Sequence, residues 1–346
     1  MEVLTVPHQF SSQFSIADRP VGGDHPVYVI AEAGVAHFGD EEKAYRLVDL
    51  AAEARADAVK FQIFDVDALV AAALPEWRER LASRQLPYEA FARIQAYCRT
   101  RRITFLATAH DEPSFEFLQG LDVPAFKIGS GEVGNWPFLT RIARRRKPVI
   151  LSTGMYTRQQ VAEALDAIAG TGHADVAVLH CVTSYPTPAE EVYLGTMAEI
   201  REMFDGVIGY SDHTRGFHLP LAAVALGARI VEKHIALDFD VPNAQDWKVA
   251  CGPDDLAAFI LQLREVESAL AAREAPTESE RESLIWASKS LVASRDISAG
   301  ATVTADDLVA KRPGTGISPA RAADVVGRAT AVRIPRDTVV QWEHLK

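Results

Sequence analysis

The sequence has little cysteine, no long apolar run and no excess of positive charge. Its three cysteines, Cys98, Cys181 and Cys251, form no spacing motif, which argues against a disulfide framework and favours a reducing compartment. No apolar stretch approaches the length of a membrane span, and the N-terminus lacks the segments of a signal peptide. The formal net charge of −11 excludes a broad basic surface. We therefore expect a cytoplasmic protein that binds neither nucleic acid nor membrane.

The chain does contain a pattern that repeats eight times, in which a short apolar run is followed by a polar turn and a candidate amphipathic helix. The runs are apolar at consecutive positions, which is typical of strands buried on both faces of a parallel sheet. Segments 41–55, 158–169, 219–229 and 254–273 have helical periodicity. Eight such units over roughly 250 residues predict a TIM (β/α)8 barrel, with a doubly wound open sheet as the alternative. The eight runs are 27–31, 58–64, 104–107, 125–128, 149–151, 176–179, 207–209 and 230–232.

The composition divides the chain into four parts. Residues 1–26 form a polar N-terminal arm or cap, and residues 27–273 form the barrel. Residues 274–283 are charged and nearly free of apolar side chains, which predicts a linker. Residues 284–346 contain short segments with scattered glycines and prolines, which predicts a small β-rich domain. About 60 residues give a marginal core, so we expect this domain to pack against another surface.

Polar residues gather where the predicted strands end, and this end of a TIM barrel faces the active site. Two lysines, Lys60 and Lys127, with hydroxyls and glycine-adjacent amides, would make a cradle for phosphate or carboxylate. Two histidines on consecutive strand ends, His213 and His234, would share a divalent metal with open positions for water or substrate. The strand-end set is Glu32, Lys60, Gln62, Thr108, Lys127, Ser130, Gly131, Glu132, Ser152, Thr153, Gly154, Thr183, Ser184, Tyr185, Asp212, His213, Glu232 and His234.

Each of these residues also has a structural explanation. A strand-end histidine can be a packed, hydrogen-bonded residue, and a strand-end lysine can be an ion-pair partner of Glu32 or Glu132. The Ser-Thr-Gly sequence at 152–154 can be the N-cap of the next helix. Glu232 can act only by orienting a histidine. The residue types alone leave these alternatives open.

Ordered motifs extend along the whole chain. They are Ala31-Glu32-Ala33-Gly34, Val59-Lys60-Phe61-Gln62, Phe126-Lys127-Ile128-Gly129-Ser130-Gly131-Glu132, Leu151-Ser152-Thr153-Gly154-Met155, His180-Cys181, Tyr185-Pro186-Thr187-Pro188, Ser211-Asp212-His213-Thr214 and Glu232-Lys233-His234. With these motifs, residues 20–346 resemble the sialic acid synthase family, enzymes that condense phosphoenolpyruvate with sugars to make nonulosonic acids. Segments 289–297 and 311–316 resemble the antifreeze-like (SAF) domain of that family.

The resemblance implies a role for each matching residue. Phosphoenolpyruvate would contact Lys60, Thr108, Lys127, Ser130, Gly131, Ser152 and Thr183. The metal, usually Mn²⁺ with Mg²⁺ or Co²⁺ as substitutes, would be held by His213 and His234. Proton transfer and the acceptor sugar would involve Glu32, Gln62, Glu132, Tyr185, Glu232 and Asp246. Arg312 matches an arginine that reaches from the SAF domain into the partner's barrel, which implies a domain-swapped homodimer.

The implied reaction joins phosphoenolpyruvate to an open-chain aldose, N-acetylmannosamine or a related hexose or hexosamine. It releases phosphate and leaves a sialic acid-like 2-keto-3-deoxy sugar acid. The chain departs from the family pattern at residues 36–39, at Thr183 and at residues 241–248, where Trp247 and Lys248 stand near the expected sugar site. These departures leave the acceptor open. Two other functions are considered: a Schiff-base aldolase or lyase with Lys127 or Lys60 as nucleophile, and a non-catalytic sugar-binding protein.

Overall fold

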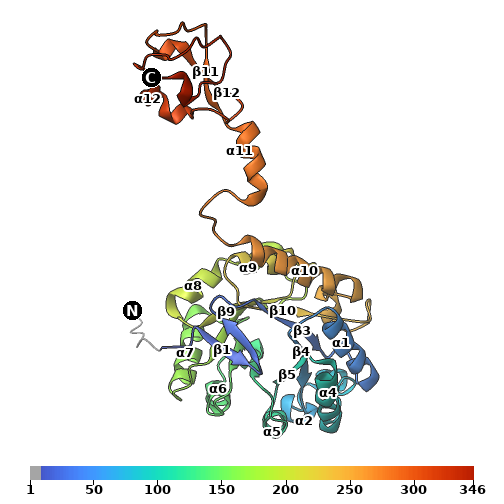
Figure 1. Cartoon of the computed structure of the whole chain (residues 1–346). Coiled ribbons are helices and arrows are strands. Elements are labelled where there is room, and N and C mark those ends of the chain that lie inside the picture. Colours follow the sequence, from blue (N-terminus) through green and yellow to red (C-terminus); the bar gives the residue numbers. More distant parts are fainter. Residues whose placement is uncertain (1–8) are drawn as a thin grey trace. The chain divides into compact units, whose positions relative to one another are not determined.

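The computed structural model describes residues 9–346, and it contains a closed barrel of parallel strands surrounded by helices (Figure 1). The barrel confirms the predicted TIM fold and excludes the open sheet. Strands and helices alternate along the chain because each apolar run is followed by an amphipathic segment. The strands close in the order β10-β3-β4-β5-β6-β7-β8-β9. They are β3 (Tyr28–Gly34), β4 (Ala58–Ile63), β5 (Thr104–Ala109), β6 (Phe126–Ile128), β7 (Val149–Ser152), β8 (Val176–Cys181), β9 (Val207–Asp212) and β10 (Ile230–His234).

The surrounding helices pack apolar faces on the barrel, and several begin at residues that cap their free N–H groups. Asp40 accepts from two backbone N–H groups of α1, and Thr157 and Gln160 form a capping box at α7. The helix expected at 254–273 ends earlier, at Ala269. The helices are α1 (Glu41–Glu53), α2 (Val66–Leu69), α3 (Pro75–Ala82), α4 (Tyr88–Arg101), α5 (Glu112–Gly120), α6 (Trp136–Ala143), α7 (Arg158–Ala169), α8 (Thr196–Met203), α9 (His218–Ala225) and α10 (Pro253–Ala269). In the described part of the chain, none of the helices has the length and apolarity that a membrane crossing requires.

A hairpin in the N-terminal segment closes one end of the barrel. Strands β1 (Gln13–Ile16) and β2 (Arg19–Gly22) pair antiparallel. Ile16 and Val21 are fully buried. They pack in one cluster with Ala58, Leu106 and other apolar residues from the first halves of the barrel strands. The interior is therefore apolar at this end. Side chains on one face of a strand recur every second residue. Two residues after Ala58 and Leu106, the inward positions near the carboxyl ends are therefore the polar Lys60 and Thr108.

The second compact unit spans residues 272–346. Its strands β11 (Ser290–Ala293) and β12 (Leu308–Lys311) pair antiparallel, and helix α12 (Ala322–Val325) contributes Val325 to a core with Leu291, Val303, Ile317, Val340 and Leu345. This unit confirms the small C-terminal domain, whose remaining strand contacts are isolated bridges.

The segment 274–283, which we expected to be a linker, is partly helical. Helix α11 (Arg281–Ala287) begins inside this segment, directly after a short 3-10 turn. Thr277 and Glu280 form a capping box at that turn, and Arg273 donates to Glu280 at 2.5 Å. The charged stretch that suggested a linker therefore contains the cap of a short 3-10 turn.

We expect Ile16→Ala to lower the free energy of unfolding by about 3 kcal/mol, because it removes a fully buried side chain from the closed end of the barrel. Urea unfolding measures this loss. Ser15→Ala, which changes an exposed residue of the same strand, is the control and should unfold at the wild-type midpoint. Equal midpoints for the two variants would contradict a stabilising role for the hairpin.

Candidate active site

A cavity of about 390 Å³ opens at the carboxyl ends of the barrel strands. Every strand of the barrel contributes a polar side chain to this cavity, either from the strand itself or from the loop that follows it. With the exception of Glu132, the cavity collects all of the site residues predicted in the barrel. They are Glu32, Lys60, Gln62, Thr108, Lys127, Ser130, Gly131, Ser152, Thr183, Tyr185, His213, Glu232, His234 and Asp246.

Two lysines and two glutamates form a buried charge network in this cavity. Lys60 Nζ lies 2.7 Å from Glu32 Oε2 and 3.7 Å from Glu232 Oε2, and Lys127 Nζ lies 3.6 Å from Glu232 Oε1. Burial raises the pKa of Glu32 although Lys60 opposes the shift. Burial would also raise the pKa of Glu232, but Lys127 and Lys60 together hold it below its ordinary value. The ion pair expected between Lys60 and Glu32 is therefore present, within the site.

An anion cradle lies beside Lys127. Lys127 Nζ donates to Ser152 Oγ at 2.7 Å, and the Gly154 N–H donates to Ser130 Oγ at 3.0 Å. A Cβ at Gly154 would collide with Thr183 Oγ1 and lie 2.8 Å from Ser130 Oγ. Hydroxyls, a backbone amide and an ammonium group thus converge where only glycine fits, as in phosphate-binding loops.

The structure excludes the explanation of residues 152–154 as a helix cap. Helix α7 starts at Arg158, and its N-cap is Thr157. Ser152 instead bonds Lys127, while Thr153 Oγ1 donates to the Leu179 carbonyl at 3.1 Å. The polar side chains of this turn therefore serve the cavity, through Ser152, and the contact between β7 and β8, through Thr153.

The two histidines face each other with ring centroids 5.4 Å apart. His213 Nδ1 lies 2.6 Å from the Val182 carbonyl and donates to it, which leaves Nε2 as the acceptor nitrogen, 2.9 Å from the Tyr185 hydroxyl. His234 Nδ1 is buried without a hydrogen-bond partner. Burial lowers the pKa of His234 well below its ordinary value, so this imidazole is neutral.

These features fit a divalent metal ion. A neutral imidazole with an orphaned nitrogen is a ready ligand, and a carbonyl bonded to the opposite nitrogen of a histidine is the usual way to fix its tautomer. No group of three or more His, Cys, Asp or Glu side chains suited to a metal occurs in residues 9–346. The chain would therefore supply two imidazoles and leave the remaining coordination positions to water or substrate.

Polar groups converge on the opposite side of the cavity around Gly34. Gln62 Nε2 donates to Glu32 Oε1 at 3.0 Å. Gly34 has φ +54°, and a Cβ there would lie 3.4 Å from both of those atoms and 3.7 Å from Asp246 Oδ2. The glycine therefore leaves a gap that an amide and two carboxylates border, a composition that suits sugar hydroxyls.

Two predicted site residues lie elsewhere. Glu132 does not line the cavity, and its Oε2 accepts from Asn135 Nδ2 at 2.7 Å. Arg312 belongs to the second unit, where its Nε donates to the Ala287 carbonyl at 3.0 Å. The roles assigned to both residues stay predictions. Trp247, which we expected near the sugar site, donates from Nε1 to the Val241 carbonyl at 3.1 Å and so packs within its own loop.

Asp212 turns away from the cavity, although it ends a strand. Its carboxylate pairs with Lys233 Nζ at 2.5 Å, with side-chain exposures of 0% and 1%, and also accepts from Thr214 Oγ1. Neighbouring residues of a strand point to opposite faces, so Asp212 and Lys233 lie behind the barrel wall while His213 and Glu232 line the cavity. This ion pair fixes the loop that carries His213.

The sequence reasoning missed His110, Arg80 and Arg84, which also line the cavity. Burial and the charges of Lys60 and Lys127 lower the pKa of His110 to about 4, so the imidazole is neutral at pH 7. The apolar run that predicted this strand ends at Ala107, whereas β5 continues to Ala109. If the predicted strand had continued through the polar Thr108 to Ala109, His110 would have been recognised as the residue directly after the strand end.

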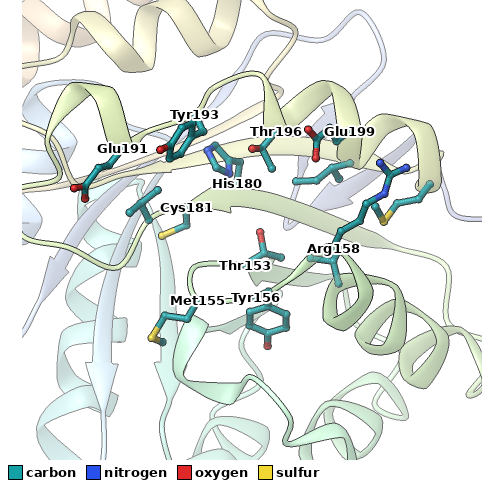
Figure 2. Close-up of a pocket in the computed structure, with 14 residues that line it drawn as sticks. Thr153, Met155, Tyr156, Arg158, His180, Cys181, Glu191, Tyr193, Thr196 and Glu199 are labelled. Carbon is teal, nitrogen blue, oxygen red and sulfur yellow. The ribbon is translucent and has the colours of Figure 1, made fainter.

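A second cavity, of about 510 Å³, lies beside the first and shares Cys181 and Met155 with it. Figure 2 shows its walls, with His180 and Cys181 on β8, and Thr196 and Glu199 on α8. His180 Nε2 lies 2.6 Å from the Val192 carbonyl, so its polar group is already satisfied. The convergent charges lie in the smaller cavity, which is the better candidate for chemistry.

Comparison with known proteins agrees with this geometry. Residues 47–275 match the NeuB family, and residues 288–346 match the SAF domain. The N,N'-diacetyllegionaminic acid synthase of Legionella pneumophila is 34% identical, over 95% of this chain and 97% of that protein. The N-acetylneuraminate-9-phosphate synthase of Mus musculus is 31% identical, over 95% of each. The crystal structure of an N-acetylneuraminic acid synthetase from Leptospira borgpetersenii, in complex with citrate, has a TM-score of 0.74 at 30% identity, over 80% of this chain and 97% of that one.

The chain therefore belongs to the NeuB family, which confirms the resemblance found in its motifs. It is an enzyme, a transferase of the sialic acid synthase type, with an SAF domain after its barrel. This class excludes the non-catalytic sugar-binding protein and the Schiff-base aldolase as functions of the site.

We expect Asp212→Asn to lower the free energy of unfolding by about 3–5 kcal/mol, because it leaves Lys233 buried without its counter-ion. Chemical denaturation measures the change. Glu202→Gln breaks the exposed pair with Arg158 and should cost less than about 1 kcal/mol. An Asp212→Asn protein as stable as the Glu202→Gln control would show that the buried pair is not needed.

Proposed function

We propose that this enzyme condenses phosphoenolpyruvate with the open-chain form of a hexose or hexosamine and releases phosphate. C3 of phosphoenolpyruvate forms a bond to the aldehyde carbon, whose oxygen takes a proton. Water then adds at C2, and the adduct loses phosphate to leave a 2-keto-3-deoxy sugar acid. The observation that carries this proposal is one cavity that joins an anion cradle, a histidine pair and a polar gap suited to a sugar.

The cradle would bind phosphoenolpyruvate. Lys127 and Lys60 would offset the charge of its phosphate and carboxylate, and the hydroxyls of Ser130 and Thr183 with the Gly154 amide would hold the phosphate oxygens. Thr108 and Ser152 contact the two ammonium groups and would hold them in place, at 3.1 Å from Lys60 Nζ and 2.7 Å from Lys127 Nζ.

The opposite wall would bind the acceptor. Gln62, Asp246 and the Tyr185 hydroxyl would contact its oxygens, and Glu32 is suited to hold the proton that the aldehyde oxygen receives, because burial raises its pKa. His213 and His234 would hold a divalent ion, for which we propose Mn²⁺, with Mg²⁺ or Co²⁺ as substitutes. Bound there, it supplies a Lewis acid for the aldehyde.

Three further features are part of the proposal. Glu132 would assist proton transfer from the edge of the site. Arg312 would reach the acceptor in a homodimer in which each SAF domain serves the partner's barrel. The enzyme would act in the cytoplasm, in sialic acid-type carbohydrate biosynthesis. The names of the relatives, which make several different sugar acids, support the reaction class and leave the acceptor to experiment.

We expect phosphate release from phosphoenolpyruvate only when both an aldose and Mn²⁺ are present, measured across a panel of hexoses and hexosamines that includes N-acetylmannosamine. His234→Ala should lower metal-stimulated turnover by at least about 100-fold and weaken Mn²⁺ binding in calorimetry, because one of two imidazole ligands is lost. His218→Ala, an exposed histidine, is the control. Full turnover of the His234→Ala enzyme after chelation would refute the metal site.

We also expect Gly154→Ala to raise the KM for phosphoenolpyruvate by about 10- to 100-fold, because the new Cβ pushes Ser130 and Thr183 out of the cradle. Steady-state kinetics with a fixed acceptor measure this effect. Gly120→Ala places its Cβ in open space and should leave the KM unchanged. An unchanged KM in Gly154→Ala would place phosphoenolpyruvate elsewhere in the cavity.

A further inference from the structure

Two arginines line the mouth of the catalytic cavity, and neither has a role in the proposed reaction. Arg80 lies in the last turn of α3, and Arg84 follows two residues after the end of that helix. Both line the catalytic cavity. Both also line an outer groove of about 690 Å³ together with Trp77 and Asn243. The two guanidinium groups therefore stand where the cavity and the groove meet.

Within the described residues, neither guanidinium has a counter-ion. In residues 9–346, no carboxylate oxygen lies within 4.0 Å of a nitrogen of Arg80 or Arg84, whereas Arg78 on the same helix pairs with Asp67. Arg80 Nε is buried and donates no hydrogen bond. Its guanidinium stacks on Trp77, whose side chain is 51% exposed, at 5.2 Å from the ring centroid. Such an unpaired buried donor is costly unless a ligand satisfies it.

The Arg84 side chain donates from Nη2 to the Asn243 carbonyl at 2.6 Å. Burial, followed by the positive charge of Arg80, lowers the pKa of Arg84 below its usual range, although Asp246 opposes the shift. The two arginines thus repel each other across a short distance. Among the described residues neither arginine has a counter-ion, although the whole chain has a net charge of −11.

The carboxylates around the pair do not neutralise it. Asp246 faces it from inside the cavity, but burial raises the pKa of Asp246, and its Oδ2 lies near Glu32 and Gln62 at the acceptor gap. Glu76 and Glu79 line only the outer groove. An anion placed between the cavity and the groove would meet two forked donors, the geometry that best recognises phosphate and carboxylate.

Phosphoenolpyruvate already has its own cations in Lys60 and Lys127, so the anion belongs to the other substrate. We propose, building on the proposed condensing function, that the acceptor sugar carries an anionic group at the end distal to its aldehyde, and that Arg80 and Arg84 bind this group. The substrate class is then a sugar phosphate or a sugar acid. A neutral hexose would offer neither guanidinium group a counter-ion and would leave the buried Arg80 Nε without a charged acceptor.

The test compares three acceptors in the phosphate-release assay: N-acetylmannosamine, its 6-phosphate, and N-acetylmannosaminuronic acid. We expect the wild-type enzyme to prefer one of the two anionic sugars over the neutral one by at least about 10-fold in kcat/KM. The Arg80→Gln/Arg84→Gln double variant should lose that preference through a KM for the anionic sugar raised on the order of 100-fold. Its KM for phosphoenolpyruvate should not change. Whether the phosphate or the carboxylate is preferred identifies the anion.

Arg78→Gln is the matched control, because its guanidinium pairs with Asp67 and lines neither hollow. It should retain the wild-type preference, and Arg80→Lys/Arg84→Lys should recover part of it. Three results would overturn the proposal: equal use of neutral and anionic acceptors by the wild type, an equal loss for both in the double variant, or a raised KM for phosphoenolpyruvate alone.

A binding experiment separates this proposal from the proposed reaction. Calorimetry with N-acetylmannosamine 6-phosphate and with N-acetylmannosaminuronic acid, in the presence of phosphoenolpyruvate, reports the anion site without turnover. Preferential binding of either anionic sugar that the double variant loses would support the site even if no acceptor released phosphate. Absence of preferential binding would reject the site whether or not the condensation occurs.

Discussion

Lys60, Lys127, Glu32 and Glu232 place two ammonium groups and two carboxyl groups in one buried layer of the barrel, and the site depends on this layer. Lys60 and Lys127 are only 2% and 4% exposed, so each needs its partners to remain charged. Removing one charge would leave another uncompensated, which couples the four residues. All four lie on parallel strands of the barrel, whose register sets their spacing more rigidly than loops can.

This balanced layer explains how an acidic protein can bind an anionic substrate. Lys60 contacts two carboxylates and the Thr108 hydroxyl at 3.1 Å, and Lys127 contacts the Glu232 carboxylate and the Ser152 hydroxyl at 2.7 Å. The groups are therefore oriented before any ligand arrives, so little reorganisation is needed when charge develops. Glu32 and Glu232 are oppositely shifted in pKa by unequal contact with the lysines, which lets similar side chains serve different roles.

Much of this arrangement was predictable from the sequence, since runs that are apolar at consecutive positions identify barrel strands, and the residues at their ends must converge. The residues that were missed have separate physical reasons. Thr108 interrupts the apolar run of β5, so the strand was predicted to end too early and His110 was overlooked. Arg80 and Arg84 belong to a segment outside the eightfold repeat. Its sequence has no hydrophobic periodicity that would indicate which side chains point into the cavity. The capping box of Thr277 and Glu280 was hidden in a charged stretch that suggested a linker.

The strand ends and the connecting segments supply different parts of the proposed site. The strand ends hold the cradle, the lysines and the histidines, which any condensation with phosphoenolpyruvate would need. The groups that would meet the far end of the acceptor, Arg80 and Arg84 with Asp246, come from connecting segments. Loops tolerate change better than barrel strands, so a new acceptor can be accommodated there without disturbing the buried charges. Relatives of similar identity that are named for different sugar acids are the outcome expected of such a design.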